Sequence, residues 1–365
     1  MIYLDHAATT PADERVIEAM AACMRGPWQN PSAAYSAAGE ARRALRQARQ
    51  AVAEALNAAP QEVLFTSGGT EANNQAVALA RGGHAVVSAI EHASVLRASR
   101  ALCREVTLVP PDERGRVTPE AVAAALRPDT RLISVQLANN ETGVLQPATE
   151  IGALARARRI PFHCDAVQAF GHIPVDVAAL NADLLTLSGH KLYGPRGVGA
   201  LYVRRGVPLP PLIHGGGQEL GLRAGSENLP AICGLAVAVR LVLEDMEARA
   251  ARERDLLAGF IDDVKRSVPG CAVLGEGAPR LPGVVALLLP GLTSEEAIAR
   301  LDLMGIQASG GAACASREQA PSHVYRAMGL SEADARRVLR FSIGRSTTET
   351  DLRTAARAIS KLYGF

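Results

Sequence analysis

The chain has 365 residues, of which 48% are hydrophobic and 21% charged, and its formal net charge is +2. These values are ordinary for a globular protein and exclude a dominant nucleic-acid surface or polybasic membrane patch. The apolar runs are too short to span a bilayer and the first residues lack the features of a signal peptide, so we expect a cytoplasmic protein with no direct contact to membrane or nucleic acid.

The first part of the chain predicts two helices behind a short extended arm. Residues 1–11 form the arm, and residues 12–24 carry apolar positions at helical spacing. After a loop at 26–32, residues 33–58 are rich in alanine and arginine and predict one long helix.

From residue 62 onward, strand patterns alternate with helix patterns. This alternation predicts an α/β domain with a mainly parallel sheet flanked by helices on both faces. The expected strands are 62–66, 85–88, 106–109, 132–137, 162–164 and 184–187, and the expected helices are 71–80, 94–103, 119–126 and 150–158.

The last third of the chain predicts a second, smaller domain of α+β type. A helical stretch at about 230–257 leads out of the first domain, and the remainder mixes a strand at 284–289 with helices. A chain of this length is also expected to form more than one core. We therefore predict a large domain at 12–257, and a small domain built from 1–11 and 258–365.

Lysine is rare in this chain, which otherwise uses arginine as its cation. Lysine occurs three times, and Lys191 follows an apolar strand that ends in Ser188-Gly189-His190. Only a primary amine can condense with an aldehyde, so a lysine kept at this position suggests covalent chemistry. The alternative is a surface lysine beside a Gly-Pro turn.

Polar residues follow several other strands of the predicted sheet. Ser67-Gly68-Gly69-Thr70 lies between a strand and a helix, where free N–H groups favour a phosphate, although an ordinary helix N-cap has the same pattern. Asp165 ends another strand, where it could hold a ring nitrogen protonated or simply cap the next helix.

His92 and Asn140 end two further strands. Because the carboxyl ends of parallel strands meet at one edge of a sheet, these groups are expected to converge on one crevice. A phosphate turn, a carboxylate and an amine together describe a site for pyridoxal 5′-phosphate (PLP).

Six motifs give the chain a resemblance to the class V aminotransferase fold group, which has the type I fold of PLP-dependent transferases. Within that group it is similar to cysteine desulfurases of the nitrogenase and iron–sulfur-cluster assembly type. The resemblance extends from Leu4 to Arg345. The motifs are N-P-S (30–32), T-S-G-G-T-E-x-N-N (66–74), E-H-x-S (91–94), N-N-E-T-G (139–143), D-A-V-Q (165–168) and S-G-H-K-x-x-G-P-x-G (188–197).

The resemblance implies how the cofactor phosphate and the amine are used. Four residues would bind the phosphate within one subunit, while Ser226 would reach the phosphate bound by its neighbour, which requires a homodimer with shared active sites. Lys191 would hold the cofactor aldehyde. The four phosphate-binding residues are Gly69, Thr70, Ser188 and His190.

The resemblance also assigns the cofactor ring and the substrate, L-cysteine. His92 would stack on the ring and move protons, and Asp165 would pair with the ring nitrogen. Gln168 and Asn140 would hydrogen-bond the ring hydroxyl oxygen. Asn140 would also contact the substrate, whose carboxylate Arg340 would clamp with its planar fork.

Cys314 differs from the other five cysteines of the chain. The six are widely spaced without a C-x-x-C pair, so neither a metal site nor a disulfide framework is expected. Cys314 lies among small residues (308–316), which predict a mobile loop with an exposed thiol. That loop resembles the catalytic loop of the desulfurases. Cys314 would attack the substrate sulfur, keep it as a persulfide, release alanine, and deliver the sulfur to an acceptor such as an iron–sulfur scaffold protein.

Three departures from the family pattern stand out. Ser226 replaces the usual threonine, the Cys314 loop reads S-G-G-A-A-C, and Leu220 stands where arginine is usual. The alternatives are a selenocysteine lyase, an aminotransferase of the same fold group, or a non-catalytic scaffold in a sulfur-transfer complex. Cys314 argues against an aminotransferase, which needs no thiol nucleophile, and the set of site residues argues against a scaffold.

Overall fold

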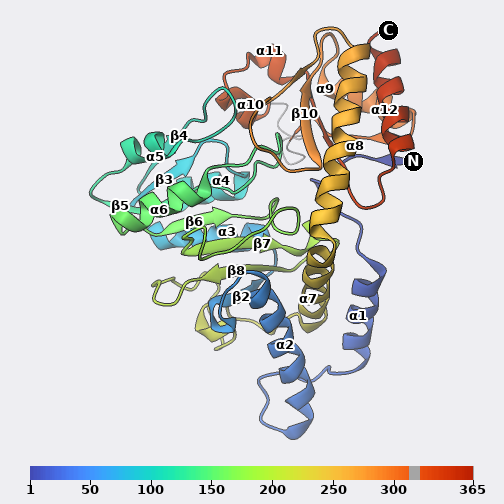
Figure 1. Cartoon of the computed structure of the whole chain (residues 1–365). Helices are drawn as coiled ribbons and strands as arrows, with labels where there is room; N and C mark the ends of the chain where they lie inside the picture. Colours follow the sequence, from blue (N-terminus) through green and yellow to red (C-terminus); the bar gives the residue numbers. More distant parts are fainter. Residues whose placement is uncertain (312–320, 365) are drawn as a thin grey trace.

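The protein is described here by a computed structural model, which places residues 1–311 and 321–364. Its centre is a seven-stranded sheet in the order β2-β8-β7-β6-β5-β3-β4, with helices on both faces (Figure 1). The strands are β2 (Val63–Thr66), β3 (His84–Ser88), β4 (Glu105–Val109), β5 (Thr130–Ser134), β6 (Phe162–Asp165), β7 (Leu184–Ser188) and β8 (Gly199–Val203).

The predicted, mainly parallel sheet is confirmed, with one addition. Strands β4, β3, β5, β6 and β7 are parallel neighbours, whereas β8 runs antiparallel to both β7 and β2. We did not predict β8, although its apolar run after Gly199 is a strand signal. The inner strands β6 and β7 are buried along their whole length; this explains the mainly apolar sequence of β7, whereas β6 also buries His163 and Asp165.

Two of the predicted helices were wrong in extent. The stretch 33–58 contains a 3₁₀ turn (Ser36–Ala38) and then α2 (Gly39–Ala55), while α1 spans Glu14–Arg25. The stretch 230–257 contains α7 (Leu229–Glu244) and α8 (Met246–Ser267), which are separated at Asp245. Asp245 leaves the helical conformation, and its carboxylate pairs with Arg249 and with Arg345 across the fold.

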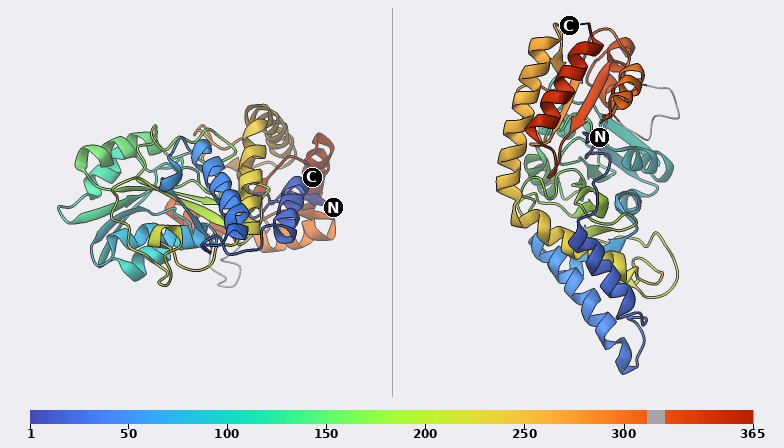
Figure 2. Two further views of the ribbon diagram at one scale, coloured as in Figure 1. Left: turned by 90° about the horizontal axis from the view of Figure 1, so that it is seen from below. Right: turned by 90° about the vertical axis from the view of Figure 1, so that its right-hand side faces the viewer.

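Helices α3 to α6 follow the predicted alternation with the strands, whereas α9 to α12 belong to the C-terminal part, where α12 packs against α8 and α9. Figure 2 shows α8 and α12 lying along one side of the molecule. These helices are α3 (Gly69–Val77), α4 (Ala93–Leu102), α5 (Pro119–Ala125), α6 (Ala148–Arg158), α9 (Ser294–Leu303), α10 (His323–Ala327), α11 (Glu332–Ala335) and α12 (Glu349–Leu362). No helix in the described part of the chain is long and apolar enough to cross a membrane.

The C-terminal part contains its own antiparallel sheet. Strand β10 (Val284–Leu288) lies between β9 (Ala272–Val273) and β12 (Val338–Ser342), while β1 (Ile2–Tyr3) pairs in parallel with β11 (Ile306–Gln307).

A separate hydrophobic cluster forms the core of this part. It combines Leu4 of the arm with Leu257 and Phe260 of α8 and with Phe341 of β12. This cluster supports a small domain that includes the arm. The predicted boundary at 257/258 falls inside the continuous helix α8, and the division into two domains stays a prediction.

Candidate active site

A cavity of about 520 Å³ lies at the carboxyl ends of the parallel strands, where ligands bind in α/β folds. Side chains from the sheet, the N-terminal arm and β12 line it. Ten of the predicted site residues are among them: Gly69, Thr70, His92, Asn140, Asp165, Gln168, Ser188, His190, Lys191 and Arg340.

The turn between β2 and α3 forms one end of the cavity. Gly68 has φ +149° and ψ −179°, a conformation that side-chain-bearing residues rarely adopt, and Thr66 Oγ1 donates to its carbonyl oxygen at 3.1 Å. The sharp turn starts α3 at Gly69, so the first N–H groups of the helix have no partner within it. These groups and the helix dipole favour an anion at this end of the cavity, and phosphate binding by the S-G-G-T motif stays a prediction.

His190 lies near this end of the cavity on the 3₁₀ turn after β7. Its Nδ1 is 3.2 Å from Thr9 Oγ1. Burial lowers the pKa of His190 to about 4, and the positive charges of Lys191 and Arg196 act in the same direction. His190 is therefore neutral at pH 7, and it can contribute a hydrogen bond to an anion but no charge.

Asp165 ends β6 and is held by two hydrogen bonds. Its Oδ1 accepts from the backbone N–H of Val167 at 2.9 Å, and its Oδ2 accepts from Asn73 Nδ2 at 2.7 Å. Asn73 also donates to Ser94 Oγ at 2.9 Å. Asp165 can therefore cap the turn at Val167 and also present its carboxylate to the cavity. Asn73 was missed as a site residue, although it belongs to the T-E-x-N-N motif.

His92 is the N-cap of α4, and its tautomer follows from its contacts. The backbone N–H of Ser94 donates to His92 Nδ1 at 3.1 Å, so the neutral ring carries its proton on Nε2. Burial lowers the pKa of His92, the charges of Lys191 and His323 lower it further, and Asp165 opposes them. The imidazole is therefore neutral near pH 7, which suits stacking on a heteroaromatic ring.

Lys191 is placed by the arm as well as by the sheet. Its Nζ donates to the carbonyl oxygens of Ala7 at 2.5 Å and Ala8 at 2.8 Å, and Gln168 Nε2 donates to Ala7 O at 2.9 Å. The arm therefore forms part of the cavity wall. Its main-chain contacts with Lys191 could not be predicted from local patterns, because some 180 residues separate the partners.

Arg340 reaches the cavity from β12 and is only 2% exposed. Its Nη2 pairs with Asp5 Oδ1 at 2.6 Å, and its Nη1 donates to the carbonyl oxygen of Asn140 at 2.8 Å. The guanidinium is thus fixed between the arm and the turn after β5. This placement makes Arg340 a buried cation available to an anionic ligand.

Two predicted site residues are not brought to the cavity by the described structure. Ser226 is exposed and does not line the cavity, so its predicted contact with a neighbouring subunit is untested. Cys314 lies outside the described residues, so its predicted role also stays a prediction. The other five cysteines are free thiols, and burial raises the pKa of Cys233 to about 12.

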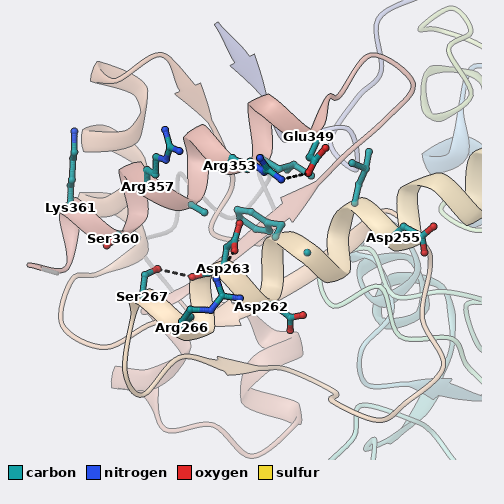
Figure 3. Close-up of a pocket in the computed structure, with 15 residues that line it drawn as sticks. Asp255, Asp262, Asp263, Arg266, Ser267, Glu349, Arg353, Arg357, Ser360 and Lys361 are labelled. Atoms are coloured by element: carbon teal, nitrogen blue, oxygen red, sulfur yellow. Dashed lines mark hydrogen bonds and ion pairs between the residues drawn. The ribbon is translucent and has the colours of Figure 1, made fainter.

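A second, larger depression of about 980 Å³ lies between α8 and α12 (Figure 3). Opposite charges line it and pair with each other, as in Arg353–Glu349 at 2.5 Å and Arg266–Asp263 at 3.1 Å. Exposed pairs of this kind contribute little to stability and offer no buried reactive group.

Within the residues that the structure places, no group of three or more His, Cys, Asp or Glu could hold a metal ion.

The comparisons with known proteins agree with the geometry of the sheet-edge cavity. The class-V aminotransferase family model matches residues 2–354. A cysteine desulfurase IscS of Dictyoglomus turgidum is 41% identical over 360 residues, covering 96% of this chain and 91% of that protein.

Two solved structures extend the comparison to three dimensions. A NifS-like protein from Rickettsia africae is 32% identical, with a TM-score of 0.93 and coverage of 100% of both chains. The structure of SspA in complex with cysteine is 37% identical, with a TM-score of 0.83 and coverage of 94% of this chain and 99% of that one. The predicted fold and resemblance are confirmed: the chain belongs to the class-V aminotransferase family and is homologous to its cysteine desulfurases.

Proposed function

We propose that this protein is a PLP-dependent cysteine desulfurase that converts L-cysteine to L-alanine and keeps the sulfur as a persulfide on Cys314. The observation that carries the proposal is the convergence of Lys191, Asp165 and the α3 N-terminus on one cavity. The desulfurase relatives at about 40% identity support the same activity. The cysteine in the SspA structure supports the substrate.

The residues of the cavity fit PLP, which carries a phosphate, an aldehyde and a ring nitrogen. The first turn of α3, with Thr70, Ser188 and His190, would hold the phosphate. Lys191 provides the amine and Asp165 the carboxylate. Cofactor and substrate are small relative to the 520 Å³ available.

Each polar residue then has a chemical task. Bound PLP would supply a carbonyl carbon for the substrate amine and an electron-withdrawing ring. The negative charge of Asp165 would keep a proton on the ring nitrogen, and the fixed Asn73 contact would keep that carboxylate oriented. Lys191 or His92 would take the α-proton of the substrate. Arg340 would bind the substrate carboxylate through its guanidinium.

The sulfur-transfer step balances without an added oxidant. The Cys314 thiolate attacks the sulfur of the substrate, a new S–S bond forms, and the substrate C–S bond breaks. The electron pair of that bond stays with the three-carbon fragment, which is protonated and leaves as alanine. The persulfide then passes to an acceptor protein, for which an iron–sulfur scaffold is our proposal, in the cytoplasm.

A homodimer would complete the site. Ser226 is exposed, and the neighbouring Gly225 N donates to Gln218 Oε1 at 3.1 Å, next to the turn at Glu219 and Leu220. The Ser226 hydroxyl would bind the phosphate held by a second subunit. The exposed apolar residues Trp28 and Leu220, at 76% and 66% exposure, are compatible with burial between two copies.

Alanine and sulfide release from L-cysteine with a reductant tests the proposal, together with the visible PLP absorption of the purified protein after incubation with PLP. Cys314→Ser is expected to keep the absorption and lose turnover, whereas the control Cys271→Ser keeps both. Full activity of Cys314→Ser would exclude Cys314 as the nucleophile and favour a lyase mechanism. Absence of both absorption and activity in the wild type would refute the cofactor assignment.

A further inference from the structure

Two polar side chains in the wall of the cavity connect residues that the proposed mechanism treats separately. Asn73 lies in α3 and is 1% exposed, and Ser94 lies in the first turn of α4 and is 9% exposed. Both line the cavity together with Asp165 and His92. Asp165 and His92 belong to different elements, and Asn73 and Ser94 link them by hydrogen bonds.

The hydrogen bonds between these four groups run in one direction. Asn73 Nδ2 donates to Asp165 Oδ2 at 2.7 Å and to Ser94 Oγ at 2.9 Å. Ser94 Oγ lies 2.7 Å from His92 Nδ1, which also accepts from the backbone N–H of Ser94 at 3.1 Å. Because Nδ1 is an acceptor, the serine hydroxyl donates its proton to the imidazole. We name Asp165, Asn73, Ser94 and His92 the relay.

The charge of Asp165 sets the direction of the relay. A carboxylate offers only acceptors, so the Asn73 amide must turn its NH₂ group toward Asp165. The other amide atom, Asn73 Oδ1, is buried and has no hydrogen-bond partner among the described residues. Such an unpaired oxygen is costly, and the two hydrogen bonds made by Nδ2 offset that cost. The second of these bonds orients the hydroxyl of Ser94.

The relay leaves His92 neutral, with its proton on Nε2. A proton on Nδ1 would face two donors, the hydroxyl and the backbone N–H of Ser94. An imidazole in this state can donate a hydrogen bond through Nε2, but Nε2 cannot take a second proton. Of the two candidates for taking the α-proton of the substrate, this state therefore favours Lys191.

The charged groups around His92 act in both directions. Burial has the largest influence and lowers the pKa of His92, the charge of Asp165 raises it, and the charges of Lys191 and His323 lower it. Glu91 precedes His92 and is fully buried, which raises its pKa well above the usual range, so it is neutral. The direct attraction by Asp165 thus favours an imidazolium, whereas the hydrogen bonds of the relay oppose it.

We propose that Asn73 and Ser94 are positioning residues, which hold His92 neutral with its proton on Nε2 under the control of the Asp165 charge. The inference rests on the proposed PLP-dependent function and deepens it. Asp165 would keep the ring nitrogen of PLP protonated, and an imidazolium stacked on that positive ring would be repelled. Through the relay, one carboxylate secures both a protonated cofactor ring and an uncharged imidazole beside it.

The first test is the pH dependence of kcat/KM for L-cysteine. Ser94→Ala removes the hydroxyl that donates to Nδ1 but keeps the backbone N–H, so protonation of His92 becomes easier. The pH below which kcat/KM falls should therefore rise by about 0.5–1 pH unit, with a smaller effect on the maximum value. Ser94→Thr keeps the hydroxyl and should restore the wild-type profile.

The second test asks whether Asn73 acts through Ser94. Asn73→Ala should shift the profile in the same direction, because the serine hydroxyl loses the donor that orients it. In the double variant the shift should equal that of Ser94→Ala alone, since no hydroxyl is left to orient. The matched control is Ser99→Ala. It removes another buried hydroxyl of α4, one without a partner among the described residues, and should leave the profile unchanged.

A third measurement reads His92 directly, without substrate or turnover. NMR of the full-length protein with ¹⁵N-labelled histidine distinguishes the two neutral tautomers from the imidazolium, and the His92 signals are identified by their loss in His92→Gln. The wild type should carry the proton on Nε2 with and without added PLP, and Ser94→Ala should become protonated at higher pH. Asn73→Ala provides the same readout if Ser94→Ala does not fold.

Three results would overturn the proposal. A proton on Nδ1 of His92 in the wild type would reverse the relay. An unchanged pH profile and NMR titration in Ser94→Ala would show that the hydroxyl does not act on His92, and a sum of both shifts in the double variant would show that Asn73 acts independently. Failure of the proposed function is distinguishable: it would appear as missing PLP absorption in the wild type or full activity in Cys314→Ser, neither of which changes the NMR test.

Discussion

The two ends of the central parallel strands carry similar residue types but use them differently. At the amino ends, His84 bridges Thr130 Oγ1 and Thr107 Oγ1, both at 2.8 Å, and Asp183 accepts from Phe162 N at 2.9 Å. These polar groups satisfy one another. At the carboxyl ends, the side chains of Asp165 and Lys191 line a cavity.

Chain direction explains this difference. In a parallel sheet, every helix that follows a strand begins near the carboxyl edge, so free N–H groups and turn residues gather there. The amino edge receives helix C-termini and has no such convergence. Similar residue types are therefore structural at one edge and available for chemistry at the other.

The largest difference between the two edges is expected from substituting two aspartates at opposite ends of β6. Asp165 is the last residue of this strand, and Asp183 accepts a hydrogen bond from its first residue, Phe162. Asp165→Asn removes the charge at the carboxyl end and should lower kcat/KM at least about 10²-fold, because the ring nitrogen would lose its anionic partner. Asp183→Asn, at the amino end, should leave turnover unchanged. Steady-state kinetics with a visible spectrum of each variant would check this. Comparable turnover in the two variants would contradict the distinction between the edges.

Substitutions at the amino ends of the strands should instead lower the free energy of unfolding. His84→Ala leaves the hydroxyls of buried Thr130 and half-buried Thr107 without their shared partner and should lower the free energy of unfolding by about 1–2 kcal/mol. The activity of the folded enzyme should not change. Urea denaturation would measure the effect, with a substitution at an exposed position of α2, Arg46→Ala, as a reference. A stable His84→Ala protein with reduced kcat would place His84 in the reaction.

Glu253 is buried in α8 and lies at neither edge of the sheet. Its substitution should have the smallest effect of the three, and that effect should be on stability. Its carboxylate lies 3.9 Å from Arg249 Nε, but burial dominates and raises its pKa to about 7. The stability that the neutral form provides is present below the unfolded pKa of about 4.5 and is lost as the pH rises through 7. Glu253→Gln should therefore add about 1–2 kcal/mol at pH 8 and nothing at pH 4.

Thermal unfolding of wild type and Glu253→Gln across this pH range would test the sign. A larger gain at pH 4 than at pH 8 would mean that the carboxylate is ionised and stabilised by Arg249 and Arg252. Activity is expected to be unchanged at every pH, in contrast to the Asp165 variant.

Much of the site could be predicted because its residues follow buried strands directly. Asp165 and the turn that leads to Lys191 come after apolar runs, and strand direction alone brings such ends together. Local sequence therefore determined the type of sheet, the edge on which the cavity lies, and most of the polar groups in it. The resemblance to desulfurases added the contribution of Arg340.

Only the tertiary structure decided which partners hold these groups. Asp5 and Arg340 are 335 positions apart, and Glu141 meets Ser322 across 181 positions, so no local pattern records either contact. The pairing of β8 with β2 and the ion pair of Asp245 with Arg345 likewise join positions that are distant in sequence. Hydrophobic periodicity reports which face of an element is buried, whereas the pairing of buried charges depends on how whole elements pack together.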